Sequence, residues 1–379
     1  MAILFWICVG LLLYAALGYP LLLRVLPAAR EVGQQHPPVP PGVSLICAAH
    51  NEEAAIGDWV ANALALEWPR ELLEVIVCCD GCTDATATRA RAAGADLVLD
   101  LDRAGKVRSQ DAGVEESSGE LLAFSDANSR WEPGALRELA AAFEDPRVGY
   151  AAGQVGFVRS DGGDNEEGLY WRYDMALREA ESRTGSITAG NGAIYATRRN
   201  AYVVVDPVMG HDLSFPYRMV KAGLRAVYVP AARASEPMVE TIGGEFARKR
   251  RMMSHAWAII LRGGLLSPRG YGAGYALKML SHRVLRYFAP LIHLVALAAN
   301  IALLGDGVVY VVALAVQLAI LAAAALATVV PLRVLRIARY YVLTTAAIAL
   351  GLWDWLRHGT TAEWEPAAAG APAPSTQDG

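Results

Sequence analysis

Long uncharged stretches lie at both ends of the chain. No charged side chain occurs in residues 1–23, 287–305 or 307–332. A helix needs ~20 mostly apolar residues to cross the hydrocarbon core of a bilayer, and each stretch is close to or above that length. The pattern therefore predicts three transmembrane helices. A fourth stretch, 340–353, has only 14 residues; it fits a tilted span completed by Leu356, an interfacial helix or a re-entrant helix.

The first stretch has two interpretations, a cleaved signal peptide or a retained anchor. Signal peptides begin with a positively charged segment and continue with an apolar core of ~7–15 residues. This stretch begins Met-Ala-Ile-Leu-Phe-Trp and is longer, which favours an anchor. Basic residues follow the first and third stretches and precede the second. By the positive-inside rule, we expect residues 28–283 to be cytoplasmic.

Between the two apolar ends, strand and helix patterns alternate. After a Pro-rich linker, the chain has strand patterns at 43–49, 73–79, 97–99 and 120–125, and helix patterns at 52–65, 83–93 and 105–116. Repeated β–α units are typical of a mostly parallel sheet with both faces covered. Such sheets bind ligands at the carboxyl ends of their strands.

Polar side chains follow three of these predicted strands. Asn51 and Glu52 come after the first, and Asp80 opens a tight turn after the second. Asp126 and Asn128 come after the strand at 120–125. A structural alternative for Asn51 and Glu52 is the N-terminus of the next helix, where Asn can cap the helix and Glu interacts favourably with the helix dipole. An Asp that ends a buried strand is costly unless it is hydrogen-bonded or binds a cation. These strand ends form a candidate ligand site.

The overall composition narrows the class of protein. The chain has 379 residues, 54% of them hydrophobic and 19% charged, with a net charge of -4, which excludes a disordered or nucleic-acid-coating protein. The five cysteines are an odd number and do not indicate a disulfide framework. Cys79 and Cys82 lack the second ligand pair of a zinc finger, which disfavours a metal or redox role. We expect the tail to be disordered.

Several motifs, in this order, resemble those of the family 2 glycosyltransferases, whose catalytic domain has the α/β GT-A fold. They lie at 43–53, 80–84, 105–106, 125–128, 188–199, 210–213 and 245–251. The membrane arrangement resembles the polysaccharide-synthase-like branch of that family. The expected organisation is an N-terminal transmembrane helix at 1–26, the linker at 27–42, a GT-A domain at 43–255, interfacial helices at 256–286, two or three transmembrane helices at 287–356, and the tail at 357–379.

The resemblance implies a donor site for a nucleotide-sugar. Glu52 and Asp80 would hold the nucleoside, and Asp126 would face the ribose and diphosphate. Mg²⁺ or Mn²⁺ would bridge the diphosphate, with Asp126 and Asn128 as oxygen ligands. The family usually has a second Asp in place of Asn128, and an amide brings no charge, so weaker metal binding is expected. Lys106 is either a phosphate contact or a solvated lysine.

Asp212 matches the catalytic base of the family. His211, just before it, stands where the family commonly has an acidic residue. It either alters the pKa of Asp212 or contacts the acceptor. A structural alternative is that Asp212 only caps the helix that follows.

Arg248 and Arg251 lie three residues apart, on one face of a predicted helix. Processive members of the family have a Gln-x-x-Arg-Trp pattern here. The resemblance implies that the arginines, Arg251 above all, stabilise a departing diphosphate. Met252 stands in place of the Trp that lies beside the acceptor. A basic helix at an anionic membrane surface is an alternative for the same residues.

These features together predict a membrane-embedded, inverting glycosyltransferase. By family likeness the donor is a UDP-sugar, and the acceptor is a lipid-linked sugar or a glycan. The alternatives are a processive polysaccharide synthase and a catalytically silent membrane scaffold that binds sugar nucleotides. A transporter needs more spans and intramembrane charges. We expect contact with membrane lipids and no nucleic-acid partner.

Overall fold

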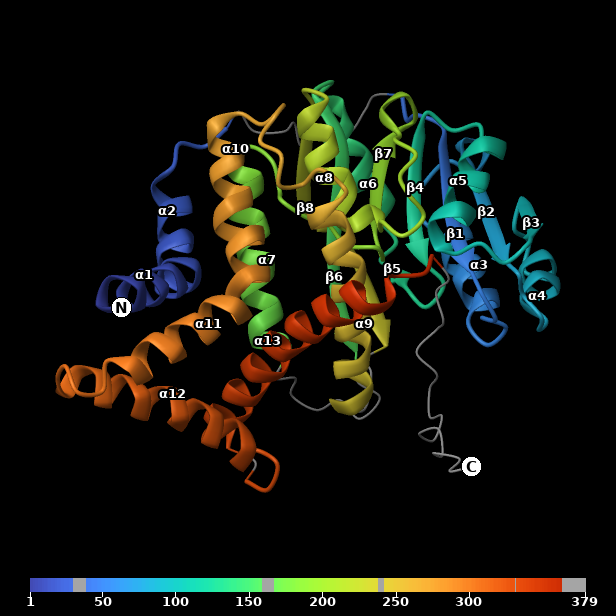
Figure 1. The fold of residues 1–379 in the computed structure, drawn as a ribbon. Helices are drawn as coiled ribbons and strands as arrows, with labels where there is room; N and C mark the ends of the chain where they lie inside the picture. The colour runs from blue at the N-terminus through green and yellow to red at the C-terminus, as the bar shows by residue number, and fades with distance from the viewer. Residues whose placement is uncertain (30–38, 159–166, 238–241, 331, 363–379) are drawn as a thin grey trace, which may run out of the picture.

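The computed structural model describes residues 1–29, 39–158, 167–237, 242–330 and 332–362. Figure 1 shows two parts: a sheet with helices packed on it, and a group of long helices that includes both the N-terminal segment and the last helices of the chain. Part of the expected linker at 27–42 and most of the tail at 357–379 lie outside the described residues.

The sheet has eight strands within the described residues. They are β1 (Val43–Ala49), β2 (Leu73–Asp80), β3 (Leu97–Leu101), β4 (Leu121–Asp126), β5 (Arg130–Trp131), β6 (Val148–Val158), β7 (Tyr195–Arg198) and β8 (Arg225–Pro237). Their order is β3-β2-β1-β4-β7-β6-β8-β5. β1 to β4 pair in parallel, as do β6 and β8, whereas β7 is antiparallel to its neighbours and β5 to β8. The predicted mostly parallel sheet is confirmed.

Alternate residues of the central strands feed two hydrophobic layers. Successive side chains of a strand point to opposite faces. Leu45 and Val75 pack in one layer, and their neighbours Ile46 and Ile76 pack in the other. All four side chains are buried. Because both faces are covered, the strand sequences are almost continuously apolar, which is why they could be recognised as strands.

Helices between the strands, and α9 after the last one, cover the two faces. They are α3 (Ile56–Leu64), α4 (Thr86–Ala92), α5 (Lys106–Glu116), α6 (Ala135–Ala141), α7 (Glu167–Arg183), α8 (His211–Lys221) and α9 (Ile242–Leu261), with 3-10 turns at η2 (Arg70–Leu72), η3 (Ala142–Glu144) and η4 (Arg199–Ala201). α3, α4 and α6 add buried residues to one layer, and α5, α8 and α9 to the other. The α5 and α8 N-termini bring Lys106 and Asp212 toward the candidate ligand site.

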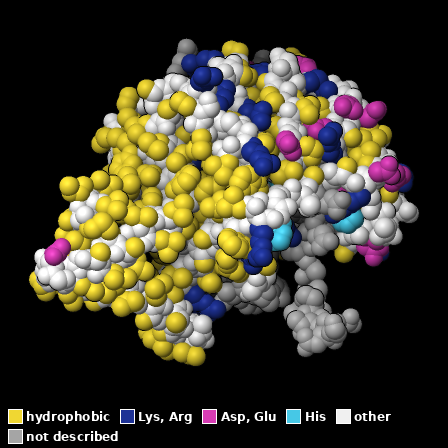
Figure 2. Space-filling view, viewed as in Figure 1, with side chains coloured by type: hydrophobic (Ala, Val, Ile, Leu, Met, Phe, Trp, Pro, Cys, Tyr) yellow, Lys and Arg dark blue, Asp and Glu magenta, His cyan; other side chains and the backbone are white. Residues whose placement is uncertain are grey.

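Four helical segments are long and apolar enough to cross a membrane within the described part of the chain. They are α1-η1-α2 (Ala2–Leu13, Tyr14–Gly18, Tyr19–Val25), α10-η5-α11 (Ala273–Lys278, Met279–Val284, Leu285–Ala302), α12 (Val308–Leu326) and α13 (Arg333–His358). Figure 2 shows their side of the molecule covered by hydrophobic side chains, with charged ones gathered over the sheet. Ile3 and Val308 are more than three-quarters exposed, as expected for lipid-facing residues.

The fourth apolar stretch forms part of a longer helix than its 14 uncharged residues imply. α13 has 26 residues and continues through the charged positions at both ends. At 1.5 Å per residue, this length suffices for a full span rather than a short re-entrant turn. Residues 256–286, expected to be interfacial helices, divide into the end of α9, a loop and the first turns of α10-η5-α11. The last of these is continuous with a candidate span.

Specific contacts join the apolar helices to the sheet domain. The Arg250 guanidinium on α9 donates two hydrogen bonds of 2.6 Å to the Asp354 carboxylate on α13. At the other end of the chain, the Tyr19 hydroxyl on α2 donates to Glu181 on α7 at 2.6 Å. Arg183 also donates to the carbonyl of Leu23 at 2.7 Å. The sheet domain is therefore joined to both α2 and α13.

Candidate active site

The loops after β1 and β2 are joined by hydrogen bonds. Asn51 adopts a φ of 53°, and its side-chain oxygen accepts a hydrogen bond of 2.9 Å from the Thr83 backbone N–H. Glu53 accepts one of 3.1 Å from the Ala85 N–H. Glu52 is half-buried between these loops. Burial and the nearby carboxylates of Asp126 and Asp84 raise the pKa of Glu52. These three carboxylates lie at or just after the ends of β1, β2 and β4 and form what we call the acidic edge of the sheet; the contact of Glu52 with a nucleoside stays a prediction.

Asp80 holds the loop that precedes α5. Its carboxylate is 2% exposed and accepts hydrogen bonds from the backbone N–H groups of Ala104 at 2.7 Å and Gly105 at 3.1 Å. The Arg103 guanidinium donates to it at 2.9 Å. Gly105 has a φ of 92°, a conformation that favours glycine. In this structure, Asp80 thus orients the turn that carries Lys106.

Lys106 and Asp126 form an ion pair at the carboxyl end of the sheet. Burial opposes the lysine charge, but the Asp126 carboxylate outweighs it and the pKa of Lys106 is raised. A Cβ at Gly192 would lie 3.2 Å from the Lys106 nitrogen and 3.5 Å from an Asp126 oxygen, so the glycine leaves room for a ligand in front of this pair. The structure brings these two predicted donor residues together.

The residues near Asp126 fit a divalent cation held mainly by a substrate. Mg²⁺ is usually bound by one or two carboxylates together with phosphates and water. Asp126 is half-buried and Asn128 is exposed in the turn after β4. The described residues contain no group of three or more His, Cys, Asp or Glu that could hold a metal. Carboxylate and amide oxygens of this kind suit Mg²⁺ or Mn²⁺.

Glu236, at the end of β8, belongs to the same acidic edge and was not predicted. The Ser129 hydroxyl donates to its carboxylate at 2.5 Å. Burial and the Asp126 charge raise the pKa of Glu236 to about 7. A charged residue at the end of an apolar strand was the available signal, the same one that identified Asp126. The sequence pattern predicted no strand at 225–237, so it did not place Glu236 at a strand end.

Asp212 lies in the first turn of α8, with Gly210 at the N-cap. α8 has no side-chain cap hydrogen bond, so the helix-capping alternative for Asp212 is wrong. Among the described residues, none donates a hydrogen bond to its carboxylate, which is half-buried at the cavity wall. A Cβ at Gly210 would approach one carboxylate oxygen to 2.8 Å. A ligand in the cavity can therefore reach this carboxylate.

His211 is buried next to Asp212, in the first turn of α8. Its imidazole is 3% exposed, stacks on Phe215 with ring centroids 4.1 Å apart, and its Nδ1 lies 2.8 Å from the Tyr195 hydroxyl. Burial, with a smaller effect of the Lys106 charge, lowers the pKa of His211 to about 3. The side chain is therefore neutral at physiological pH. It packs in an aromatic layer that supports the first turn of α8.

The two arginines on α9 have different surroundings. Arg248 donates two hydrogen bonds of 2.8 Å to Glu245 and lines the central cavity. Arg251, one turn further on, is not among the described residues that line it. The Arg251 charge acts on His255 instead, adding to burial in lowering the pKa of that imidazole. Of the two arginines predicted to share a face of the helix, only Arg248 lines the cavity among the described residues.

One cavity of about 380 Å³ connects these groups. Four of the predicted site residues line it: Lys106, Asp126, Asp212 and Arg248. Glu52, Asp80, Asn128 and Arg251 lie outside the lining that the structure describes. The lining extends to Tyr287 on α11 and Ile348 on α13. The cavity thus runs from the acidic edge of the sheet to the apolar helices.

Comparison with known proteins identifies the family of the catalytic region. The family described as Glycosyltransferase like family 2 matches residues 40–254. An N-acetylglucosaminyltransferase of Rhizobium meliloti (strain 1021) is 28% identical over 226 residues, 53% of this chain and 52% of the relative. A poly-β-1,6-N-acetyl-D-glucosamine synthase of Staphylococcus aureus (strain COL) is 22% identical over 232 residues, 58% of this chain and 56% of the relative. The chain spans about half the length of these curated relatives.

A solved structure shares the fold over most of the chain. A mannosyltransferase from Pyrobaculum calidifontis, in complex with GDP-Man and Mn²⁺, has a TM-score of 0.70 at 22% identity and covers 93% of this chain and 99% of its own. That similarity confirms the GT-A fold. The family match covers more than half of the chain and includes Asp126, Asp212 and Arg248. The protein belongs to glycosyltransferase family 2, and its family-matched region has the GT-A fold.

Proposed function

We propose that the protein is an inverting, membrane-embedded glycosyltransferase that uses Asp212 as general base. The observation that carries this proposal is the Asp212 carboxylate, which accepts no hydrogen bond from any described residue and faces the cavity that Lys106 and Asp126 also line. The acceptor hydroxyl gives its proton to Asp212 as its oxygen bonds to the anomeric carbon. The bond from that carbon to the diphosphate breaks, and the nucleoside diphosphate leaves with the electron pair.

Cationic side chains support the departure of the nucleoside diphosphate. Lys106 lies at the N-terminus of α5, where the helix dipole also favours anions. Arg248 lines the same cavity, and we propose Arg251 as a more distant contributor. A divalent cation held by Asp126, Asn128 and the substrate would neutralise part of the diphosphate charge. Preorganised charges of this kind stabilise the transition state because they need no reorganisation during the reaction.

The acceptor side of the cavity faces the apolar helices. Tyr287, Tyr340 and Ile348 line it from α11 and α13. This placement supports a lipid-linked acceptor or a glycan held near the membrane surface. We also propose that the catalytic domain lies on the cytoplasmic side, because of the basic residues that flank the candidate spans. Protease added outside intact cells should leave this domain uncut, and its cleavage there would contradict the orientation.

A donor screen with the purified full-length protein in lipid nanodiscs tests the reaction. UDP-sugars and GDP-sugars are supplied with Mn²⁺ and a membrane-lipid extract, and released nucleoside diphosphate is measured. We propose turnover with a UDP-sugar and a product whose anomeric configuration, measured by NMR, is opposite to that of the donor. Turnover with GDP-sugars alone would exclude the uridine preference, and a retained configuration would exclude the inverting mechanism.

Processive synthesis is the second candidate, favoured by the relative named a poly-β-1,6-N-acetyl-D-glucosamine synthase. Met252 lines the cavity where processive relatives have a Trp. An aromatic ring stacks on sugars, and a thioether does not. We therefore propose transfer of one or a few sugars. The chain length of the product, measured by mass spectrometry, decides between the two, and a long polymer would establish the synthase.

A further inference from the structure

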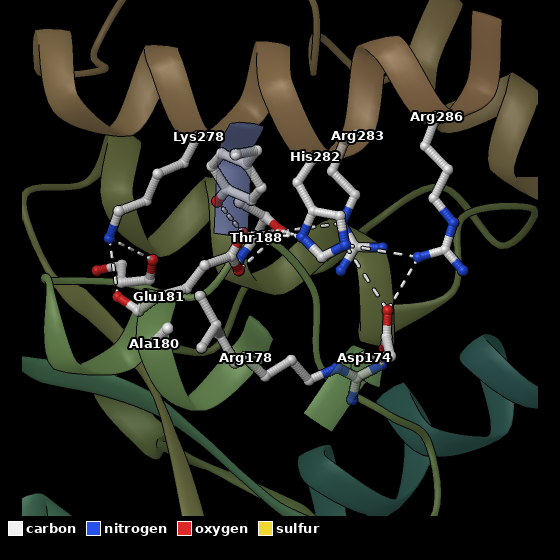
Figure 3. Close-up of polar contacts among 12 residues, drawn as sticks. Asp174, Arg178, Ala180, Glu181, Thr188, Lys278, His282, Arg283 and Arg286 are labelled. Carbon is white, nitrogen blue, oxygen red and sulfur yellow. Dashed lines mark hydrogen bonds and ion pairs between the residues drawn. The ribbon is translucent and has the colours of Figure 1, made fainter. Parts of the chain in front are cut away.

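A buried polar cluster joins the catalytic domain to the membrane helices (Figure 3). α7 contributes Asp174, Arg178 and Glu181, and the helix α10-η5-α11 faces them with a row of basic residues. That row consists of Lys278, His282, Arg283 and Arg286. The two helices are 101 residues apart in sequence at the contact between His282 and Glu181. The cluster is separate from the acidic edge of the sheet, yet part of it lines the same cavity.

Both carboxylates of the cluster already have several donors. Glu181 accepts hydrogen bonds from the Tyr19 hydroxyl at 2.6 Å and the Thr188 N–H at 2.9 Å, and it pairs with His282 at 2.8 Å. Asp174 pairs with Arg178 at 3.0 Å and Arg286 at 2.9 Å. Burial opposes ionisation, but these partners dominate and lower the pKa of both carboxyls, that of Glu181 to about 2.

The cluster carries more positive than negative charge. Even with His282 neutral, the four cations Lys278, Arg178, Arg283 and Arg286 face only two carboxylates. Arg178 is 6% exposed and Arg283 is 5% exposed. An excess of buried charge costs several kcal/mol unless a counter-ion is bound. The cluster therefore favours an additional anion.

Donor groups of the two buried arginines are available for that anion. Within the described residues, Nε and Nη1 of Arg178 and Nη2 of Arg283 have no hydrogen-bond partner. Both side chains line the central cavity. Buried guanidinium N–H groups are nearly always satisfied, and phosphate oxygens match their fork geometry. Arginines from two separate helices converge on one wall of the cavity.

A single segment links this wall to the reaction centre. Thr188 accepts a hydrogen bond of 2.9 Å from Arg283, and the N–H of Gly190 donates one of 2.7 Å to the Asp212 carbonyl. Gly192 lies beside the Lys106–Asp126 pair. Two residue steps span at most ~7 Å and four at most ~14 Å. The short segment 188–192 therefore connects the arginine wall with the elements that carry Asp212 and Lys106.

We propose that Arg178 and Arg283 form an anion subsite that binds the phosphate of a lipid-phosphate acceptor. The lipid chain lies toward α11 and α13, whose Tyr287, Thr344 and Ile348 line the adjoining wall, and the hydroxyl to be glycosylated faces Asp212. This inference rests on the proposed function and specifies its acceptor. The donor diphosphate has its own cation, Lys106, at the other end of the cavity.

Binding measurements on the full-length protein in an uncharged detergent test the subsite. The probes are dodecyl phosphate, its neutral analogue dodecanol, and inorganic phosphate. We expect dodecyl phosphate to bind at least about tenfold more tightly than either of the others, because it has both the charge and the chain. Inorganic phosphate that binds as tightly as dodecyl phosphate would show a site for a free ion and overturn the lipid-linked assignment.

Two variants connect that binding to the arginines. Arg178→Gln and Arg283→Gln should each weaken dodecyl phosphate binding about tenfold, the loss of one or two charge-assisted hydrogen bonds. The matched control is Arg269→Gln, an exposed arginine in the loop before α10, which should bind as the wild type does. Wild-type affinity in both cluster variants would overturn the inference.

The folded state of each variant is checked by its thermal unfolding. Asp174 keeps Arg286, and Glu181 keeps Tyr19 and His282, so neither substitution leaves a carboxylate alone. Should a Gln variant fail to fold, Arg178→Lys or Arg283→Lys replaces it. Lysine keeps the positive charge but lacks the planar guanidinium that can donate two parallel hydrogen bonds, so these variants should still bind dodecyl phosphate more weakly than the wild type does. The Asp212→Asn variant tests the proposed function separately from the subsite. Sugar transfer by this variant would refute Asp212 as the base. It would not change the conclusion on dodecyl phosphate binding.

Discussion

The ammonium group of Lys106 pairs with the carboxylate of Asp126 directly in front of Gly192. This contact brings the first residue of α5 against the last residue of β4. Under the proposed function, the positive charge of Lys106 faces the diphosphate of the donor. The geometry explains why the loop before α5 is held so firmly by Asp80.

Removing the Lys106 charge should slow sugar transfer. Lys106→Met keeps much of the side-chain volume but removes the cation that we propose to face the diphosphate. We expect kcat/KM for the donor to fall about 10²-fold, as when one preorganised charge is lost. Lys106→Arg keeps the charge and should retain more activity. Equal kcat/KM values for Lys106→Met and the wild type would exclude a phosphate contact.

Adding a methyl group at position 192 should disturb the same pair. The Cβ of Gly192→Ala would lie 3.2 Å from the Lys106 nitrogen, so the lysine has to move. We expect the donor KM to rise about tenfold, because small displacements in such sites are costly. Gly57→Ala is the control: its Cβ meets no atom within 4 Å on α3. That variant should keep the wild-type KM.

Glu236 should contribute to metal dependence. Its carboxylate is close enough to Asp126 for the two charges to interact. In Glu236→Gln, the Mn²⁺ concentration that gives half-maximal activity should rise about tenfold, as for other supporting residues of metal sites. Glu132→Gln, an exposed carboxylate in the loop after β5, is the matched control. An unchanged metal requirement in Glu236→Gln would remove Glu236 from the site.

The pKa of Glu181 gives the fold an acid-sensitive contribution. The folded pKa of about 2 is lower than the ordinary value of 4.5, so the unfolded chain binds the proton more tightly. The stabilisation is therefore complete above about pH 5 and is lost as the pH falls from 4.5 toward 2. It amounts to about 3 kcal/mol. Thermal unfolding followed from pH 7 to pH 3 should show a smaller acid-induced decrease in Glu181→Gln; identical profiles would contradict this.

Local sequence patterns predicted the features that short stretches of the chain determine by themselves. Apolar strand runs and the polar residues after them located Asp126, and the motif before α8 located Asp212. Helical periodicity placed Arg248 and Arg251 on one face, but only the packing of α9 shows that Arg248 lines the cavity. Arg178 and Arg283 were missed because their contact joins helices far apart in sequence. A basic row on an apolar helix was the signal, and it was interpreted only as a membrane flank.

The hydrogen-bond partners of Asp80 could not be predicted from the sequence. The resemblance to family 2 glycosyltransferases implied that Asp80 contacts the nucleoside, which stays a prediction. The structure shows its carboxylate bonded to the backbone of the following loop. Sequence patterns do not reveal which carboxylates are satisfied by backbone N–H groups, because these bonds depend on loop geometry.

Transfer by the Asp212→Asn variant tests the central claim most directly. The amide preserves the shape of the side chain but cannot accept the proton of the acceptor hydroxyl. Full-length variant and wild type are compared in nanodiscs for sugar transfer and for nucleotide binding, with Asp58→Asn, an exposed carboxylate on α3, as control. We predict transfer at least about 10³-fold slower, nucleotide affinity within about twofold of wild type, and an unaffected control. Transfer at the wild-type rate in Asp212→Asn would contradict the account.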